Sequence, residues 1–441
     1  MNTIKYPVNI SKKQIFILSI PVFFANLAVP FVGMVDTGLM GNLGDSKYLA
    51  ATSIATSTMT MIVWSFGFLR MGTVGIVAQL FGKRDYREII KTLLRNFLFA
   101  IIAAIIIILL KPFLLDAIKH FFSTSLEAND LINEYLSIRI FSIPAELIIY
   151  ILIGFYLGIQ KTKVSSLLIV IFSLLNIIFS SFFVLSMNLN ISGVAYGTLI
   201  SSYITLILFC FFTYFFIVKK FQIIPNFENV LIRSKLTKLL NINFNIFIRT
   251  LLLTFSFLWI TYLGSKLGED YLAANTILIQ FIILSAFFLD AYAFSTEGIV
   301  GFTIGRKNKK SFLLVVKNSM QMSFFTSIII SLFFLIFYKQ IISIITNIDI
   351  LRFISYQHFI WIIIIPPVAS FCYQLDGIFI GASQTKEMRN AMIISVASFL
   401  VISIYLTKQF GNHGLWFSLL LFMALRSITL IFFFNKILKK F

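Results

Sequence analysis

The chain has 441 residues, of which 59% are apolar and only 12% are charged, whereas a soluble globular domain carries about 25% charged residues. Its mean hydropathy is +0.96, and apolar runs long enough to cross a bilayer core of about 30 Å recur from end to end. This composition excludes an ordinary soluble protein and indicates a polytopic membrane protein.

Twelve apolar stretches separated by polar breaks are the candidate membrane spans. Within hydrocarbon every backbone N–H and C=O group must be paired internally, and these runs are too long and too uniformly apolar for the strands of a membrane barrel. We therefore expect twelve helices. They cover approximately residues 14–40, 48–80, 92–111, 134–158, 164–187, 193–217, 239–263, 272–303, 313–338, 353–380, 391–407 and 415–435.

The net charge of +19 is distributed unevenly over the loops between these spans. When the N-terminus is placed in the cytoplasm, the inner loops and tails hold 25 Lys and Arg residues and the outer loops hold 7. Because Lys and Arg accumulate on the cytoplasmic side, this alternation predicts an even number of spans and two cytoplasmic termini. We expect the protein to lie in the inner (cytoplasmic) membrane of a bacterium. The charge is thus a topology signal and does not indicate a nucleic-acid partner.

An internal repeat relates the two halves of the chain. The tetrapeptide YLAA at residues 48–51 recurs at residues 271–274, a shift of 223 residues. One register over more than a hundred residues is not expected by chance for Gly, Pro and Lys, and a shift of six spans gives the halves the same orientation. Further pairs in this register are Gly75 with Gly298, Gly82 with Gly305, Pro144 with Pro367, Gly154 with Gly377, Gly158 with Gly381 and Lys163 with Lys386.

The predicted fold is therefore an all-α polytopic membrane protein with twelve transmembrane helices in two six-helix parallel-repeat bundles. Residues 1–218 form the N-lobe, residues 219–238 a cytoplasmic connector, and residues 239–441 the C-lobe. Two homologous bundles facing one another are typical of a secondary transporter that alternates access by rocking one bundle against the other. We expect a monomer, because each chain already contains both lobes.

Asp36 is the acid of the first span, within the segment PFVGMVDTG. Pro21 and Pro30 lie in the same span, and a proline inside a helix removes a backbone hydrogen bond and favours a kink. Burial disfavours the charged form of a carboxyl group, so Asp36 could bind and release a proton, or hold Na⁺ if oxygen ligands surround it. The alternative is a structural Asp hydrogen-bonded to a neighbouring helix.

Charged residues also occur in the spans of the second half. Asp290 and Glu297 are seven residues apart, nearly two helical turns, and therefore lie on one face of the eighth span. Asp376 lies in the tenth span, and Arg249, in the seventh, requires an acid partner. An internal ion-pair network and a direct role in binding substrate or cation are both compatible with this pattern. Glu146, close to Pro144, is a weaker candidate.

Several classes of function lack their motifs. No Walker A sequence is present, no Ser-His-Asp arrangement is recognisable, and the three histidines are spaced too widely for a metal cluster. Cys210 and Cys372 lie inside apolar runs, where small apolar packing is the expected role. We expect neither an enzyme nor a cofactor.

Five segments resemble those of the multidrug and toxic compound extrusion (MATE) family, specifically its DinF-like branch. The resemblance covers nearly the whole chain and implies two six-helix lobes around a central cavity. It also implies export of organic, often cationic, compounds against an inward flow of H⁺ or Na⁺. The segments are Pro30 to Gly44 (PFVGMVDTGLMGNLG), Phe66 to Asp85, Ile246 to Leu251, Phe288 to Gly305 and Leu375 to Met392.

By this resemblance Asp36 matches the first-helix carboxylate assigned to cation coupling, and Asn176 and Thr198 match two further polar positions of an N-lobe cation site. Some members carry a second Asp four residues after that Asn, where this chain has Ser180. Ser180 supplies an oxygen without a charge, which favours H⁺ over Na⁺.

The resemblance also bears on the C-lobe. Asp376 resembles a tenth-helix acid that other branches use for coupling, but Arg249 stands where those branches carry a Glu, which argues for an ion-pair network.

The expected function is H⁺-coupled antiport of small organic cations or amphiphilic drugs, with membrane lipid as the surrounding partner. The alternative is a flippase for a lipid-linked oligosaccharide or lipid of the same superfamily. Such a flippase would line its cavity with several Arg or Lys, and embedded cations are few here.

Overall fold

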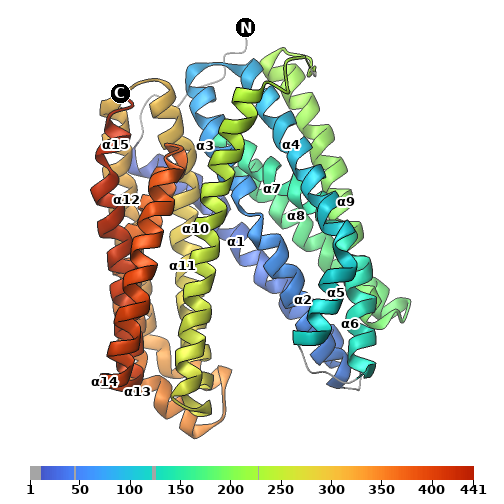
Figure 1. The fold of residues 1–441 in the computed structure, drawn as a ribbon, viewed down its shortest axis with the longest axis vertical. Helices are drawn as coiled ribbons and strands as arrows, with labels where there is room; N and C mark the ends of the chain where they lie inside the picture. The colour runs from blue at the N-terminus through green and yellow to red at the C-terminus, as the bar shows by residue number, and fades with distance from the viewer. Residues whose placement is uncertain (1–10, 44–45, 122–125, 227) are drawn as a thin grey trace. The chain divides into compact units, whose positions relative to one another are not determined.

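The computed structural model describes residues 11–43, 46–121, 126–226 and 228–441, and every element assigned there is a helix (Figure 1). The predicted all-α class is confirmed. In chain order the elements are α1 (Lys12–Gly41), α2 (Ser46–Ser65), α3 (Phe68–Lys83), α4 (Tyr86–Leu109), α5 (Lys111–Phe121), α6 (Leu126–Arg139), η1 (Ile140–Ser142), α7 (Ile143–Gly158), α8 (Thr162–Ser181), η2 (Phe182–Ser186), α9 (Asn190–Phe216), η3 (Ile217–Phe221), α10 (Arg233–Lys266), α11 (Glu269–Gly305), α12 (Lys309–Ile345), α13 (Asp349–Gly381), α14 (Thr385–Phe433) and α15 (Asn435–Leu438).

Eleven helical segments of the described chain are long and apolar enough to cross a membrane. The last, Thr385–Leu438, has 54 residues and would extend for about 80 Å as one helix, more than twice the thickness of a bilayer core. Gly411 interrupts it, with φ at 57° and ψ at −135°, and this left-handed conformation is one that glycine adopts readily. The break divides the segment into two spans, which agrees with the twelve predicted.

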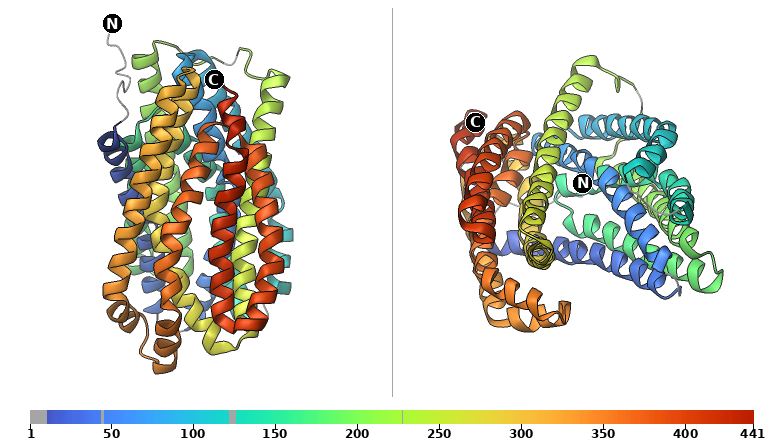
Figure 2. Two further views of the ribbon diagram at one scale, coloured as in Figure 1. Left: turned by 90° about the vertical axis from the view of Figure 1, so that its left-hand side faces the viewer. Right: turned by 60° about the horizontal axis from the view of Figure 1, so that its bottom comes forward.

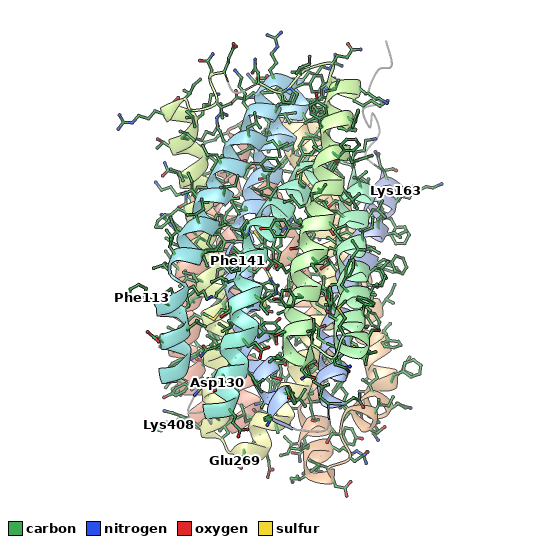
Figure 3. The ribbon with its side chains drawn as sticks, turned by 90° about the vertical axis from the view of Figure 1, so that its right-hand side faces the viewer. Phe113, Asp130, Phe141, Lys163, Glu269 and Lys408 are labelled. Atoms are coloured by element: carbon green, nitrogen blue, oxygen red, sulfur yellow. The ribbon has the colours of Figure 1, made fainter. Side chains whose placement is uncertain are left out.

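The outer faces of the helices are apolar, as contact with lipid requires. Ile207 and Phe211 lie one turn apart on α9 and are 65% and 66% exposed. Figure 3 shows Phe113 and Phe141 projecting outward between the charged Lys163 and Asp130, which lie toward opposite ends. In a soluble protein such a surface would be a large exposed apolar patch, and here it is the face that contacts the bilayer.

The helices pack into two compact units. The N-terminal unit runs from Phe24 to Leu239, and the C-terminal unit comprises the first turns of α1, up to Phe23, together with Leu240–Phe441. In the C-terminal unit the Ser19 hydroxyl lies 2.8 Å from that of Ser295, and the ring centroids of Phe23 and Phe288 lie 4.2 Å apart. Helix α1 therefore contributes to both units, whereas the predicted lobe boundaries at residues 218 and 239 stay a prediction.

Helix α13 is the central helix of the C-terminal unit. Helices α11, α12 and α14 all pack against it, and the orange and red helices of this unit run side by side in both views of Figure 2. Phe281 of α11, Phe334 of α12 and Phe359 of α13 form its aromatic core, with ring centroids 5.1 to 6.5 Å apart. This burial of aromatic surface holds the three helices together.

The repeat is visible as equivalent close helix contacts in the two units. Helix α3 packs against α7 in the first unit, and α11 packs against α13 in the second. A Cβ atom on Gly154 would lie 2.5 Å from the Arg70 carbonyl oxygen, and one on Gly377 would lie 2.7 Å from that of Ala293. Both members of one pair correspond to those of the other at the 223-residue shift, so the repeated glycines are required for close approach of two helices.

We predict that Gly154→Ala or Gly377→Ala lowers the free energy of unfolding by roughly 1–3 kcal/mol, because the new Cβ atom overpacks a backbone contact. The matched control is Gly38→Ala, since a Cβ atom on Gly38 meets nothing within 4 Å and alanine favours a helix. Thermal unfolding of the purified protein in detergent measures the effect. Equal stability of all three variants would contradict this role for the repeated glycines.

Candidate functional site

The carboxyl group of Asp36, on α1, is buried inside the N-terminal unit. The residue is 8% exposed, and its Oδ1 atom is fully buried without a hydrogen-bond partner among the described residues. The Ser180 side chain of α8 interacts with this carboxyl group, and the positive charge of Arg139 acts on it. A buried carboxylate costs free energy unless it is compensated, and Oδ1 of Asp36 has no such compensating hydrogen bond within the described residues.

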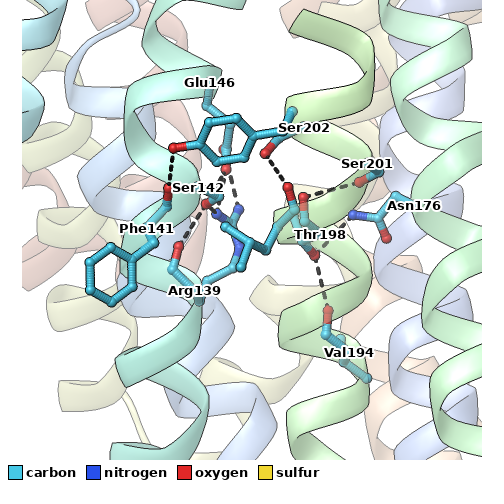
Figure 4. A network of polar contacts seen from close by, with 11 residues as sticks. Arg139, Phe141, Ser142, Glu146, Asn176, Val194, Thr198, Ser201 and Ser202 are labelled. Atoms are coloured by element: carbon cyan, nitrogen blue, oxygen red, sulfur yellow. Dashed lines mark hydrogen bonds and ion pairs between the residues drawn. The ribbon is translucent and has the colours of Figure 1, made fainter. Parts of the chain in front are cut away.

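The three polar residues that the sequence associates with Asp36 form a chain of hydrogen bonds. Ser180 Oγ lies 3.3 Å from Asn176 Oδ1, and the Asn176 amide donates to Thr198 Oγ1 at 2.9 Å. Figure 4 shows Asn176 and Thr198 together with the Val194 carbonyl that accepts from Thr198. The structure thus brings the four residues of the predicted N-lobe site into one cluster on α1, α8 and α9.

A glycine on α9 makes this cluster possible. A Cβ atom on Gly197 would lie 2.6 Å from the backbone nitrogen of Ser180 and 2.7 Å from its Cα atom. Only glycine leaves room for α9 to approach α8 this closely. The approach places Thr198, the next residue, within reach of Asn176.

A second polar group lies in the same unit, at a short 3₁₀ turn within a membrane span. Helix α6 ends at Arg139, η1 follows, and α7 begins at Ile143 with Pro144 in its first turn, where proline is well tolerated. The Arg139 guanidinium is paired with the Glu146 carboxylate and also contacts the Ser142 hydroxyl. The sequence analysis did not single out Arg139 and ranked Glu146 low; the signal was their spacing of seven residues around Pro144.

In the C-terminal unit, one acid is shared by two arginines. Arg249 of α10 and Arg426 of α14 both donate to Asp376 Oδ2 of α13, Arg426 at 2.6 Å. The predicted network between Arg249 and an acid is therefore present, but Arg426 was not among the predicted members. It lies inside the last predicted span, residues 415–435, but the sequence analysis gave it no role.

The other two predicted acids of this half lie on α11. Glu297 is 1% exposed, at the close contact where its backbone oxygen meets Gly381. Asp290 is partly buried, and its charge acts on Tyr373 and Cys372 of α13. Asp290 therefore lies near the helix that carries Asp376.

The repeat also shows what occupies the C-terminal counterpart of the Asp36 site. At the 223-residue shift Asp36 corresponds to Trp259, Ser180 to Ser403 and Asn176 to Phe399. The Trp259 indole donates to the Ser403 hydroxyl at 3.0 Å. The contact between the first helix and the serine is thus kept, but an indole replaces the carboxylate, and Phe399 is buried and apolar.

Two of the predicted residues are prolines of α1. Pro21 and Pro30 both lie within α1, which is assigned as one helix from Lys12 to Gly41. The kink proposed for them stays a prediction.

Two of the three histidines come together, although they are far apart in the sequence. The rings of His358 and His413 lie 4.2 Å apart, and Trp361 Nε1 donates to His413 Nδ1 at 3.1 Å. Within the described residues no group of three or more His, Cys, Asp or Glu side chains could hold a metal ion. The pair is part of an aromatic cluster.

Comparison with known proteins identifies the family. The family model MatE matches residues 21–182 and again residues 246–407, one match in each half. The DNA damage-inducible protein F of Escherichia coli K12 is 31% identical over 424 residues, which cover 95% of this chain and 91% of that protein.

Solved structures of MATE transporters share the fold of this chain. An outward-facing multidrug resistance MATE family transporter has a TM-score of 0.88 at 16% identity, covering 97% of this chain and 96% of its own. A mutant of the Vibrio cholerae MATE transporter VcmN has a TM-score of 0.85 at 18% identity, covering 97% of each chain. The family matches in both halves, the curated relative and the shared fold show that this chain belongs to the MATE family of multidrug efflux transporters, in its DinF-like branch, and is not an enzyme.

Proposed function

We propose that this transporter exports small organic cations or amphiphilic compounds in exchange for protons, and that Asp36 is the carboxyl group that couples the two movements. Asp36 is a buried acid connected to the hydrogen-bonded chain of Ser180, Asn176 and Thr198. This arrangement carries the proposal, because an acid within a membrane span is costly unless it has a function or a partner.

The neutrality of the side chains joined to Asp36 favours H⁺ over Na⁺. Ser180 and Thr198 offer hydroxyl groups and Asn176 an amide, so Asp36 supplies the one negative charge of this chain of contacts. A proton needs a single carboxylate, since it forms a covalent bond with oxygen. A sodium ion keeps its charge, and this cluster would offer it one carboxylate with neutral oxygens, where some family members offer two carboxylates.

The C-terminal unit supports assignment of coupling to the N-terminal site. Trp259 and Ser403 occupy the positions equivalent to Asp36 and Ser180 and are hydrogen-bonded to each other. An indole does not exchange protons or bind Na⁺. Of these two equivalent positions, coupling therefore uses the one in the N-lobe.

In the proposed cycle, protonation of Asp36 removes the negative charge that holds a cationic substrate. Substrate and proton compete for the same carboxylate, and each shifts the conformational equilibrium by its differential affinity for the two states. The moving bodies are the N-lobe, residues 1–218, and the C-lobe, residues 239–441, joined by the connector 219–238. The protein acts as a monomer in the bacterial inner membrane, with both termini in the cytoplasm.

We predict that Asp36→Asn abolishes export while leaving the protein folded, because asparagine keeps the shape of the side chain but cannot be charged. Efflux of a fluorescent organic cation from proteoliposomes measures this, first under a pH gradient and then under a Na⁺ gradient. Wild type is expected to respond to the pH gradient alone. Full activity of Asp36→Asn would refute the coupling role, and absence of export under either gradient would favour the flippase.

We predict that Ser180→Ala lowers pH-driven export by about tenfold, because the Ser180 side chain that interacts with the Asp36 carboxyl group is removed. Ser403→Ala is the matched control, since it removes the equivalent serine of the other half. This control is expected to retain export within about twofold, because the bond between Trp259 and Ser403 is not part of the coupling site. Equal losses in both variants would indicate a purely structural serine at each position.

We propose that the ion pairs of Asp376 with Arg249 and Arg426 stabilise the fold of the C-lobe. Asp290 and Glu297 are candidates for the substrate path. Asp376 neutralises one of two positive charges contributed by Arg249 and Arg426, which are 6% and 2% exposed. Removal of one partner from a buried ion pair leaves an uncompensated charge, which is strongly destabilising.

We predict that Asp376→Asn lowers the free energy of unfolding by about 3–5 kcal/mol, because both arginines lose their acid. Asp36→Asn, in contrast, should leave stability unchanged or increase it, since a buried carboxylate with one unpartnered oxygen is removed. Denaturant unfolding of the two variants in detergent makes the comparison. A stable, inactive Asp376→Asn would instead assign this acid to transport.

A further inference from the structure

The connector between the two halves of the chain is held against α4 by a buried arginine. Arg95 of α4 is 3% exposed. Its Nε atom donates to the Val230 carbonyl oxygen at 2.6 Å, and its Nη2 atom lies 3.4 Å from the Asn229 carbonyl oxygen. Val230 is itself 3% exposed. Because hydrogen bonds from a charged donor are the stronger kind, the guanidinium fixes the backbone of the connector at this point.

One acid completes this arrangement and also reaches the helix that follows the connector. Arg95 Nη1 donates to Glu88 Oε1 at 2.7 Å. Lys235 Nζ, in the first turn of α10, lies 3.6 Å from the same oxygen. We call Arg95, Glu88 and the backbone of Val230 the connector clamp. The charge of the buried guanidinium is thus compensated only while the clamp is closed around it.

The start of the connector is attached to the same helix. Phe221 is 6% exposed, and its ring is stacked on that of Tyr86, at the beginning of α4, with centroids 4.6 Å apart and an interplanar angle of 13°. The connector therefore contacts α4 at Phe221, at Val230 and, through Lys235, where α10 begins. A segment held at three places along its length is not a loose tether.

The second repeat has uncharged residues at the two side-chain positions of the clamp. At the 223-residue shift Arg95 corresponds to Asn318 and Glu88 to Ser311. Packing of the repeated helices therefore does not depend on an arginine and a glutamate at these positions. The pair occurs in the repeat that the connector follows.

Helix α10 starts in one unit and continues in the other. The boundary between the units falls between Leu239 and Leu240, inside this helix. Beyond the boundary Asn245 is held within the C-terminal unit: Arg389 Nη1 donates to its Oδ1 atom at 2.9 Å, and its Nδ2 atom lies 3.5 Å from Thr385 Oγ1. Movement of one unit against the other must therefore be taken up before Asn245.

The segment between these anchors is the weakest part of this helix. Asn241, Asn243 and Asn245 are three asparagines within five residues, and asparagine is a poor helix former because its side chain competes for backbone hydrogen bonds. Hinges commonly use a few residues near the end of an element. Bending here breaks no ion pair, whereas opening the connector clamp would leave a buried arginine uncompensated, which is strongly destabilising.

We propose that the connector clamp makes the connector a rigid part of the N-lobe, so that movement of the lobes is taken up within α10, between Leu239 and Asn245. This inference rests on the proposed alternating movement of the lobes. Arg95 is then a positioning residue: it determines where the chain bends and takes no part in binding substrate or proton.

The test measures distances between spin labels by pulsed electron paramagnetic resonance, in a protein whose native Cys210 and Cys372 are replaced by alanine. One label is placed at Leu231→Cys, next to Val230 and 63% exposed. The second is placed at Lys163→Cys in the N-terminal unit or at Lys386→Cys in the C-terminal unit. These two lysines are exposed and equivalent in the repeat, so they form a matched pair.

The distances are compared at low and at high pH. The distance from the connector to position 163 is expected to change by less than about 2 Å, and the distance to position 386 by more than that. The opposite pattern, a connector that keeps its distance to position 386 and changes that to position 163, would overturn the proposal. So would a change above that limit in both distances.

Arg95→Ala tests the clamp itself. The distribution of distances between positions 231 and 163 is expected to broaden by about twofold, because the connector can then open locally. Arg87→Ala, an exposed arginine on the same helix, is the matched control and should leave the distribution unchanged. Equal widths in wild type and Arg95→Ala would overturn the role of the clamp.

The wild-type comparison needs no change at the clamp, so it decides the proposal even if Arg95→Ala does not fold. Failure of the proposed proton coupling gives a different pattern, in which neither distance responds to pH. In that case the widths for Arg95→Ala and Arg87→Ala still decide whether the clamp holds the connector.

Discussion

Burial of a charge inside a membrane protein costs free energy, and this cost explains how the buried polar residues of this chain are paired. Each buried arginine singled out at the two polar centres is paired with an acid: Arg139 with Glu146, and Arg249 and Arg426 with Asp376. Asp36 differs, because its Oδ1 atom is buried without a partner among the described residues. A carboxylate in that state is stabilised when it acquires a positive charge, which is the property that a coupling site needs.

The two repeats share their backbone contacts and differ in their polar residues. Gly154 and Gly377 approach equivalent carbonyl groups, so the same close helix packing is built twice. At the equivalent polar positions, however, Asp36 is matched by Trp259, and the pair of Arg139 and Glu146 is matched by buried apolar residues. The two bundles are thus similar in packing, but the first carries a carboxyl group at the position where the second has an indole hydrogen-bonded to a serine.

Much of the candidate site was predictable because its signals are local. An acid in an apolar run, as at Asp36, is conspicuous at any depth in the membrane, and the resemblance to a known family added Asn176, Ser180 and Thr198. The sequence analysis gave too little weight to Arg139, Glu146 and Arg426. The position of a residue within a predicted span does not show whether its side chain faces lipid, headgroups or protein. That depends on the 3₁₀ turn η1 and on the packing of α14 against α13, which no local pattern reveals.

The sequence by itself determined the membrane class, the twelve spans and the parallel repeat, since hydropathy and the register of Gly, Pro and Lys are properties of the chain. The tertiary structure decided which polar side chains meet. Asp376 pairs with two arginines, and the Ser180 side chain interacts with Asp36. At the equivalent position of the C-terminal unit, Trp259 is hydrogen-bonded to Ser403. The physical reason is that electrostatic interactions and hydrogen bonds act over a few ångströms. Helices far apart in sequence come within that range only through the packing of each bundle.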